Sequence, residues 1–396
     1  MFLILSPYPF TEFHNYHYEI DILRKKLNCK VEIHDLSPII NKKMGKNLFL
    51  TKKAKVTKFT SFFQWKDKFN QLKKNNDLLV LNLLDISLKS LFLNFILKKS
   101  NVRILKISSS GVCEYTDKKY NLKINEFIKK LRIALTNLPA IIFFFKFKIL
   151  NILNRCVRQN VIHLVSGNKN KQPPLTSDRI IKFHSYDYSK FILTKKKINI
   201  NLTKKSIVIY LDKPSPYFKS DLNLFGIKND INANKWYSDL NLFFHKIEQM
   251  FYSKLIIIPH AKVKGITNPY YDKKFAVNHD LDAAPKLTMK SKFVISCVGS
   301  TALAYAVASY KPITLIYSDF DNKSLSLHKN RIYASKILGT SLINISKKFI
   351  KKNILRKVSV KKYDAYKYRY LTSKKLSNLK NYEIINNIIK EPNYLN

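Results

Sequence analysis

The sequence predicts an α/β protein of two domains, each a parallel sheet covered by helices, followed by a helical extension. Two observations carry this prediction. Short apolar and β-branched runs alternate with segments of helical spacing in both halves, and 396 residues exceed the usual size of one core. A Lys-rich stretch at 195–205 is typical of a linker. We therefore expect domains at 1–195 and 206–340 and the extension at 341–396.

The first half opens with a strand, a helix and a second strand. Residues 2–5 form a buried apolar run, residues 20–27 have helical spacing, and residues 31–34 show a second strand pattern. The alternation continues with strands at 77–84, 102–107 and 161–165 and a helix at 87–99. This order predicts a parallel sheet with helices on its faces.

The loop after the first strand, residues 6–18, is a candidate site that carries Glu12, His14 and His17. In open α/β sheets, ligands collect at the loops that follow the carboxyl ends of strands. Glu12 is the first candidate for a catalytic base and His14 the second, because either group can take up a proton. The alternative is a solvated polar loop.

Residues 124–157 interrupt this pattern. Their centre, 138–145, is strongly apolar but much shorter than the roughly 20 residues that span a bilayer. Basic residues such as Lys129, Arg132 and Arg155 flank it on both sides. The pattern suits a segment in the headgroup region of an anionic membrane, and a helix buried between domains or in a dimer contact is an equal alternative.

The second half places polar residues directly after strands. Residues 206–211 are followed by Asp212 and Lys213, and residues 255–258 lead to His260. Because carboxyl ends of parallel strands meet at one edge, we expect these side chains to converge. His260 can donate a proton to a departing phosphate oxygen, or it caps a backbone carbonyl as an ordinary strand-end histidine.

The βαβ unit at 290–318 has a Gly299-Ser300-Thr301 corner between its first strand and its helix. A helix start has unpaired N–H groups and partial positive charge, so with a glycine and two hydroxyls it can hold a phosphate. The alternative is an ordinary helix cap behind a glycine turn. Convergence with Asp212 and His260 favours the phosphate. Beyond residue 320 the pattern weakens, and 376–390 is a terminal helix.

The chain is strongly basic, with 72 Lys and Arg against 26 Asp and Glu and a formal net charge of +46. Charge alone suggests a polyanion or an anionic membrane as partner. The basic residues are almost all Lys and are spread along the chain, which is also typical of compositional bias. No helix-turn-helix, zinc finger or RNA-binding aromatic signature occurs, so we expect no nucleic-acid partner.

Compartment is indicated by the cysteines and the N-terminus. The four cysteines are widely separated and include no CxxC pair, so we expect free thiols in a reducing compartment and no structural zinc. The N-terminal apolar run lacks a preceding basic region and meets two prolines, which favours a first strand over a signal peptide. We expect a cytoplasmic protein.

Five stretches of the sequence resemble a known family: SPYPF at 6–10, HSYDY at 184–188, IYLD at 209–212, IPH at 258–260 and KFVISCVGST at 292–301. They look like bacterial surface-carbohydrate biosynthesis proteins of the GT-B glycosyltransferase type. The resemblance covers most of residues 1–370. It implies two facing Rossmann-like domains, a donor nucleotide held by the C-terminal one, and neither a cofactor nor an obligatory metal.

The strand-end histidine with its hydroxyl pair is also similar to the donor site of sialyl- and Kdo-type transferases. On that resemblance His260, Ser300 and Thr301 contact the donor phosphate. Gly299, Asp212 and Lys213 complete the set of candidate donor-binding residues, because they lie at the same strand ends and helix corner. The chain departs from the family by reversing the usual His-Pro order. Asp280-Leu-Asp282 has the form of a metal-binding motif, but no apolar strand leads into it, so no metal ligand is predicted.

The resulting hypothesis is a metal-independent GT-B glycosyltransferase, peripheral on the inner face of the cytoplasmic membrane. It would move a sugar from a nucleotide-sugar donor, with CMP-linked donors considered, to a growing surface glycan such as lipopolysaccharide or capsule, or to a lipid-linked acceptor. Two alternatives stay open. One is a nucleotide-sugar epimerase or hydrolase of the same fold, and the other is a non-catalytic assembly protein that binds polyanions or membranes.

Overall fold

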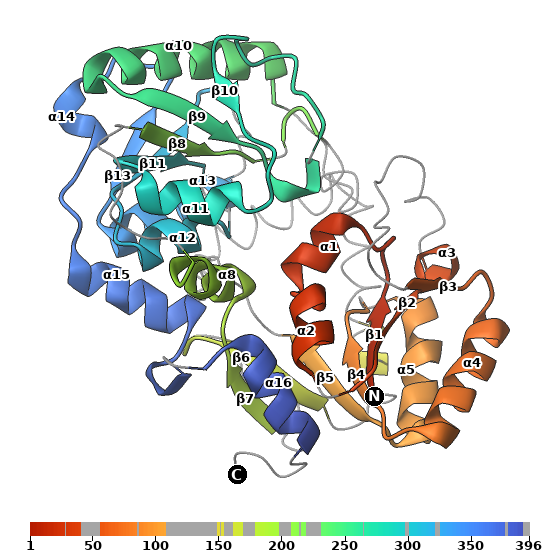
Figure 1. Cartoon of the computed structure of the whole chain (residues 1–396). Helices are drawn as coiled ribbons and strands as arrows, with labels where there is room; N and C mark the ends of the chain where they lie inside the picture. The colour runs from red at the N-terminus through yellow and green to blue at the C-terminus, as the bar shows by residue number, and fades with distance from the viewer. Residues whose placement is uncertain are drawn as a thin grey trace, which may run out of the picture.

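The computed structural model describes most of both halves of the chain (Figure 1). The described residues are 1–27, 29–40, 56–84, 87–107, 149–150, 152–153, 161–168, 179–197, 207–213, 215–218, 231–263, 265–297, 301–320, 325–376 and 379–390. Within them the strands form two sheets, and every strand pair in both sheets is parallel.

The first sheet has the strand order β3-β2-β1-β4-β5-β6-β7 among the described residues. Its strands are β1 (Phe2–Ser6), β2 (Val31–Asp35), β3 (Val56–Lys58), β4 (Leu79–Asn82), β5 (Arg103–Ile107), β6 (Val161–Ser166) and β7 (Arg179–Phe183). The helices described in this half are α1 (Glu12–His17), α2 (Ile20–Lys26), α3 (Ser37–Ile40), α4 (Phe62–Asn75), α5 (Leu88–Ser100) and α8 (Tyr186–Lys195).

The second sheet has the order β10-β9-β8-β11-β12-β13 among the described residues. Its strands are β8 (Ile207–Leu211), β9 (Lys254–Ile258), β10 (Ala276–Val277), β11 (Phe293–Ser296), β12 (Ile313–Tyr317) and β13 (Ser341–Asn344). The accompanying helices are α10 (Ala233–Phe251), η2 (Ala261–Val263), α11 (Ala283–Lys290), α12 (Leu303–Ala308), α13 (Leu325–Leu338) and α14 (Lys351–Ile354).

Each sheet separates two hydrophobic cores, because alternate residues of a strand point to opposite faces. In β1, Phe2 and Ile4 belong to one core and Leu3 and Leu5 to the other. In β8, Val208 and Tyr210 face the core under α10, whereas Ile209 and Leu211 face the core under α12. The near-continuous apolar strands seen in the sequence are therefore those of sheets buried on both faces.

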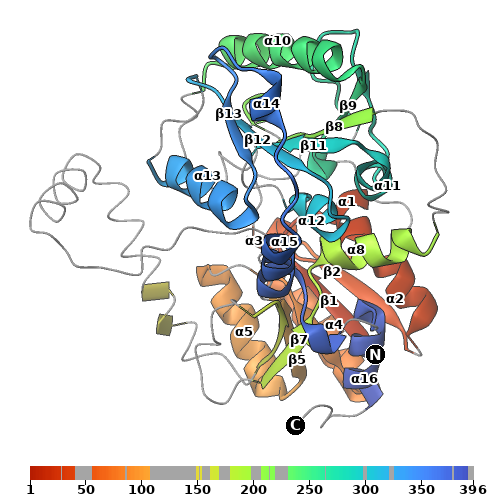
Figure 2. The same cartoon turned by 90° about the vertical axis from the view of Figure 1, so that its left-hand side faces the viewer.

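The end of the chain crosses back from the second sheet to the first (Figure 2). It comprises α15 (Val360–Tyr366), a π-helical turn η3 (Lys367–Leu371), a short η4 (Lys374–Leu376) and α16 (Asn381–Lys390). Ile384, Ile385 and Ile388 of α16 are buried in the same core as Phe2 and Ile4. The C-terminal extension thus completes the first domain.

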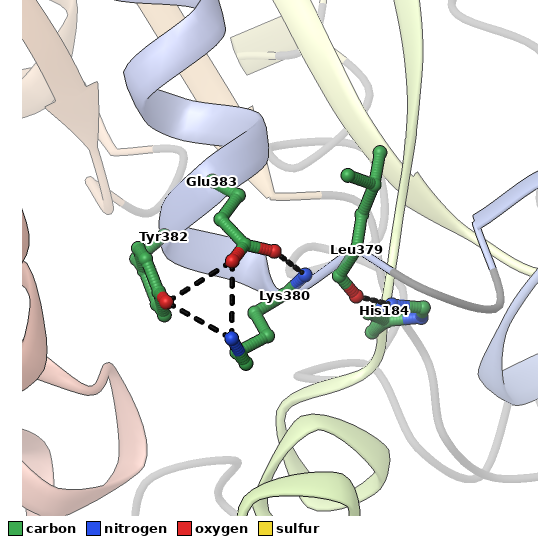
Figure 3. A network of polar contacts seen from close by, with 5 residues as sticks. All are labelled: His184, Leu379, Lys380, Tyr382 and Glu383. Carbon is green, nitrogen blue, oxygen red and sulfur yellow. Dashed lines mark hydrogen bonds and ion pairs between the residues drawn. The ribbon is translucent and has the colours of Figure 1, made fainter.

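The buried His184, at the end of β7, forms hydrogen bonds with the C-terminal segment (Figure 3). The His184 Nε2 lies 2.8 Å from the carbonyl oxygen of Leu379, and Nδ1 lies 2.7 Å from the Thr372 hydroxyl. Because a carbonyl can only accept, Nε2 carries the proton and Nδ1 accepts from the hydroxyl. Nearby, the Lys380 ammonium lies 3.0 Å from Glu383, whose carboxylate accepts from the Lys380 backbone amide at the start of α16.

Several elements differ from the sequence-based expectation. The loop expected at 6–18 contains α1, which begins after Thr11. The boundary expected at residue 340 leaves out β13, which pairs with β12 in the second sheet. Strands β3 and β10 were not predicted, because strands of two or three residues show too little periodicity to recognise. Helix α4 was not predicted either.

Within the described part of the chain, no helix has the length and apolarity needed to cross a membrane. The segment at 124–157 lies outside the described residues except for 149–150 and 152–153. Of the four cysteines, the structure describes Cys29 and Cys297, and both are free thiols.

Candidate active site

A cleft of about 750 Å³, including space open to solvent, lies where the two domains face each other. Its lining comes from both halves of the chain. The first half contributes Phe13, Tyr16, His17 and Asp187, and the second contributes Leu211, Asp212, Ile258, Pro259, His260, Ala261, His279, Asp280, Leu281, Ala284, Thr301, Ala302 and Tyr305.

The C-terminal wall is built at the carboxyl edge of the second sheet. Asp212 follows β8, His260 follows β9, and Thr301 stands just before α12. Their strands are neighbours and parallel, so their ends meet. The structure thus brings together Asp212, His260 and Thr301 as the sequence predicted, while their chemical roles stay predictions. Gly299 and Ser300 lie outside the described residues.

Asp212 is buried at the base of this wall, with 7% of its surface exposed. Burial raises the pKa of this carboxyl to about 7, because desolvation disfavours the charged form. Its neighbour Lys213 does not line the cleft, and the Lys213 ammonium lies 4.2 Å from the ring centroid of Trp236. The predicted donor contact of Lys213 therefore has no support from its position.

The N-terminal wall is one face of α1. Phe13, Tyr16 and His17 line the cleft, and their spacing of three and four residues places them on the same side of a helix. The sequence analysis named His17 as a candidate but missed Phe13 and Tyr16, because it treated these residues as a loop. The signal that identifies them is Thr11 as a helix cap followed by aromatic residues at helical spacing.

Glu12 and His14, the bases predicted from sequence, lie at the start of the same helix but do not line the cleft. The Nδ1 atom of His14 accepts from the backbone N–H of Thr11 at 3.1 Å and lies 2.8 Å from its hydroxyl. This nitrogen therefore serves the helix cap. His17 is the imidazole of α1 that lines the cleft.

Two contacts join the walls of the cleft. The rings of Phe13 and His260 lie with centroids 6.3 Å apart, and the Tyr305 hydroxyl donates to Asp187 at 2.9 Å. Burial and the Asp282 carboxylate raise the pKa of Tyr16 far above its ordinary value, so this phenol stays neutral. The cleft therefore holds a neutral hydroxyl beside its carboxylates.

The lining is rich in carboxylates although the chain as a whole is basic. Asp187, Asp212 and Asp280 reach it, together with the three histidines His17, His260 and His279. Carboxylates accept hydrogen bonds from sugar hydroxyls, and imidazoles can hold or move protons. A surface built to bind polyanions would carry cations instead.

The motif at 280–282 is used for backbone turns. The carboxylate of Asp280 accepts from the backbone N–H of Asp282 at 3.2 Å, and Asp282 lies 3.4 Å from Lys286 in α11. Among the described residues, no group of three or more His, Cys, Asp or Glu side chains is placed to hold a metal ion.

A smaller side pocket adjoins the cleft and shares Asp212, Pro259 and His279 with it. Its other lining residues are Tyr217, Phe218, Val263, Ile266, Asn268, Tyr271 and Val277. The hydroxyl of Tyr271 is buried there. Apolar walls with a few polar atoms are typical of small-molecule binding pockets.

No protein-family model and no curated protein matches this sequence. Solved structures do match. A variant of the wall teichoic acid polymerase TagF aligns with a TM-score of 0.55 at 12% identity, over 98% of this chain and 88% of that one. A second TagF variant gives 0.52 at 11% identity with the same coverage. The glycosyltransferase SnogD from Streptomyces nogalater gives 0.45 at 10% identity, over 98% of both chains.

At these identities the TagF likeness concerns the fold. The chain has the GT-B fold of two facing α/β domains, and the fold class predicted from the sequence is confirmed.

Proposed function

We propose that the protein is a glycosyltransferase that moves a sugar from a nucleotide-sugar donor to a growing surface glycan or lipid-linked acceptor. The observation that carries this proposal is the cleft between the two domains, with His260 and Thr301 on one wall and His17 on the other. Two walls that belong to different domains can bind two different substrates. The GT-B fold, shared with a wall teichoic acid polymerase, supports the same reaction class.

The donor lies on the C-terminal wall in this proposal. His260, the Thr301 hydroxyl and the corner at 299–300 contact its phosphate, and the side pocket next to Asp212 receives its base. As the bond between the sugar and the phosphate oxygen breaks, negative charge grows on that oxygen. Hydrogen bonds from His260 and Thr301 stabilise this charge. A cytidine nucleotide is the first candidate for the donor.

The acceptor lies against α1. Its hydroxyl oxygen attacks the anomeric carbon of the donor sugar, the hydroxyl proton passes to His17, and the nucleotide leaves with the phosphate oxygen. His17 is the candidate base because it lines the cleft and, unlike His14, is not the residue whose Nδ1 serves the helix cap. Asp187 and Asp280 orient sugar hydroxyls as acceptors of hydrogen bonds.

The proposed reaction uses no cofactor beyond the donor substrate and no metal, because histidine and hydroxyl donors take over the stabilisation of the leaving phosphate. We place the enzyme in the cytoplasm, peripheral on the inner face of the membrane, where lipid-linked acceptors of lipopolysaccharide or capsule are exposed. The basic segment at 124–157 supports this location by its sequence pattern.

The test is a binding screen with CMP, CDP, UMP, UDP and GDP on wild type, His260→Ala and His245→Ala. His245 is a matched control, because it lies on α10 and does not line the cleft. Its Nε2 atom lies 2.9 Å from the carboxylate of Asp272. We expect one nucleotide to stabilise wild type and His245→Ala. His260→Ala should lose about 1.5–3 kcal/mol of binding free energy, the usual value of a hydrogen bond to a charged group.

Two outcomes would contradict the proposal. If folded protein responds to no nucleotide, the non-catalytic assembly role gains weight. If a nucleotide sugar is converted to free sugar or to an epimer in the absence of any acceptor, the protein is an epimerase or hydrolase of the same fold.

A further inference from the structure

Helix α5 carries apolar side chains on both of its faces. Leu93 and Leu97 are fully buried in the core beneath the first sheet. On the other side Leu88, Phe92 and Phe95 are 54%, 67% and 43% exposed. Their spacing of four and three residues places them along one stripe. A surface helix ordinarily carries polar residues there, so this stripe requires an explanation.

Helix α4 also carries an exposed aromatic side chain. Its buried residues Trp65 and Phe69 pack in the same core as Leu93 and Leu97, so α4 and α5 cover the same face of the sheet. At its start Phe63 is 73% exposed. Figure 2 draws the short described pieces at 149–150 and 152–153 on the same side of the domain as α5, and Ile149, Ile152 and Leu153 are exposed as well.

The two helices are rich in lysine. Helices α4 and α5 together carry Lys66, Lys68, Lys73, Lys74, Lys89, Lys98 and Lys99, and their only acidic residue is Asp67. The Lys99 ammonium lies 4.7 Å from the ring centroid of Phe95. Aromatic rings beside lysines match the boundary between acyl chains and anionic headgroups, where rings enter the bilayer and ammonium groups meet phosphates.

We propose that the α4–α5 face docks on an anionic lipid bilayer, with Leu88, Phe92 and Phe95 entering its interfacial layer. Charge complementarity favours an anionic bilayer over other partners. A second copy of the chain would place the same lysines against one another, and like charges repel. A soluble polyanion would pair with the lysines but would leave the exposed rings in water. This inference stands on the exposed stripe and its lysines, and it does not depend on the proposed sugar transfer.

The experiment is sedimentation of the full chain with two kinds of vesicle: phosphatidylcholine alone, and equal parts of phosphatidylcholine and phosphatidylglycerol. The variants are Phe92→Ser with Phe95→Ser, and Leu242→Ser as a control. Leu242 is 59% exposed on α10 in the other domain. We expect wild type and the control to bind anionic vesicles in a salt-sensitive way, and the double variant to bind roughly tenfold or more weakly.

Circular dichroism will establish that the double variant is folded, and its exposed positions predict little change in stability. The proposal fails if wild type does not bind anionic vesicles. It also fails if the double variant binds them as well as wild type, since lysines elsewhere would then account for binding. Self-association of wild type that the double variant abolishes would assign the face to a second copy and overturn the proposal.

Discussion

Phe13 of α1 and His260 at the end of β9 face each other across the cleft, with ring centroids 6.3 Å apart and planes inclined by 41°. Nearly 250 residues of chain separate them. The contact places the imidazole that we assign to the donor phosphate next to the helix that we assign to the acceptor. The two proposed substrates would therefore meet beside the contact between Phe13 and His260.

The catalytic assignment predicts different losses for neighbouring residues of α1. His17→Ala should lower the transfer rate by about 10²–10⁴-fold, the usual contribution of a general base, while nucleotide binding changes little. His14→Ala should instead lower the free energy of unfolding by about 0.5–2 kcal/mol, because His14 serves the helix cap. Rates per folded enzyme and urea unfolding separate the two effects.

Glu12→Gln tests the base first predicted from the sequence. If this variant loses transfer and His17→Ala keeps it, the proton passes to Glu12, and α1 must then shift when substrate binds. Retained transfer in Glu12→Gln supports His17.

Nucleotide binding should depend on the protonation of Asp212. Because its pKa is about 7, the carboxyl is mostly neutral at pH 6 and mostly charged at pH 8. The charged form repels a phosphate in the adjoining cleft, so affinity should fall as pH rises through 7. Asp212→Asn removes this titration. Calorimetry across that range should give a flatter profile for the variant, and an unchanged profile would assign the titration to another group.

Acid should destabilise the protein through buried neutral histidines. Burial lowers the pKa of His184 below its ordinary value of 6.5, and burial lowers that of His34 to about 4. Well above pH 6.5 both rings are neutral in the folded and the unfolded chain, so their contribution to stability is complete. Below pH 6.5 these histidines bind protons in the unfolded chain but stay neutral in the folded chain, so the free energy of unfolding decreases.

Each such histidine adds at most about 1.4 kcal/mol per pH unit to the slope of the free energy of unfolding against pH. Urea unfolding between pH 7 and 5 should therefore show a smaller slope in His184→Gln and in His34→Gln than in wild type. Equal slopes in all three proteins would mean that neither ring stays neutral in the fold.

The backbone of η3 packs closely against Gly167, just after β6. Its φ is +67°, and a Cβ at this position would collide with the carbonyl oxygen of Arg369 in η3. Gly265 has a φ of +76° with open space around it. Gly265→Ala should therefore cost only the strain of a left-handed residue, roughly 1–2 kcal/mol. Gly167→Ala should cost about 1–3 kcal/mol more because the backbones must separate.

Thermal or urea unfolding of the two glycine variants provides the comparison. Equal losses would show that η3 can move away from β6 at little cost, and the crossing would then be looser than its contacts indicate.

The sequence by itself determined the fold class and one wall of the cleft. Apolar strands alternating with helices specify two parallel sheets, and parallel strands end at the same edge. That rule alone predicts that Asp212, His260 and Thr301 lie together, as they do in the cleft. The strength of the prediction lies in local periodicity, which each strand and helix carries within its own few residues.

Only the tertiary structure decided what faces that wall. Whether His14 or His17 reaches the cleft depends on the rotation of a six-residue helix, and so short a segment shows too little periodicity to fix it. Asp187 and Tyr305 meet because α8 packs against α12 across the domain boundary. The pKa of Asp212 depends on burial by residues from distant parts of the chain. Such long-range packing leaves no local pattern, so it had to be observed in the folded protein.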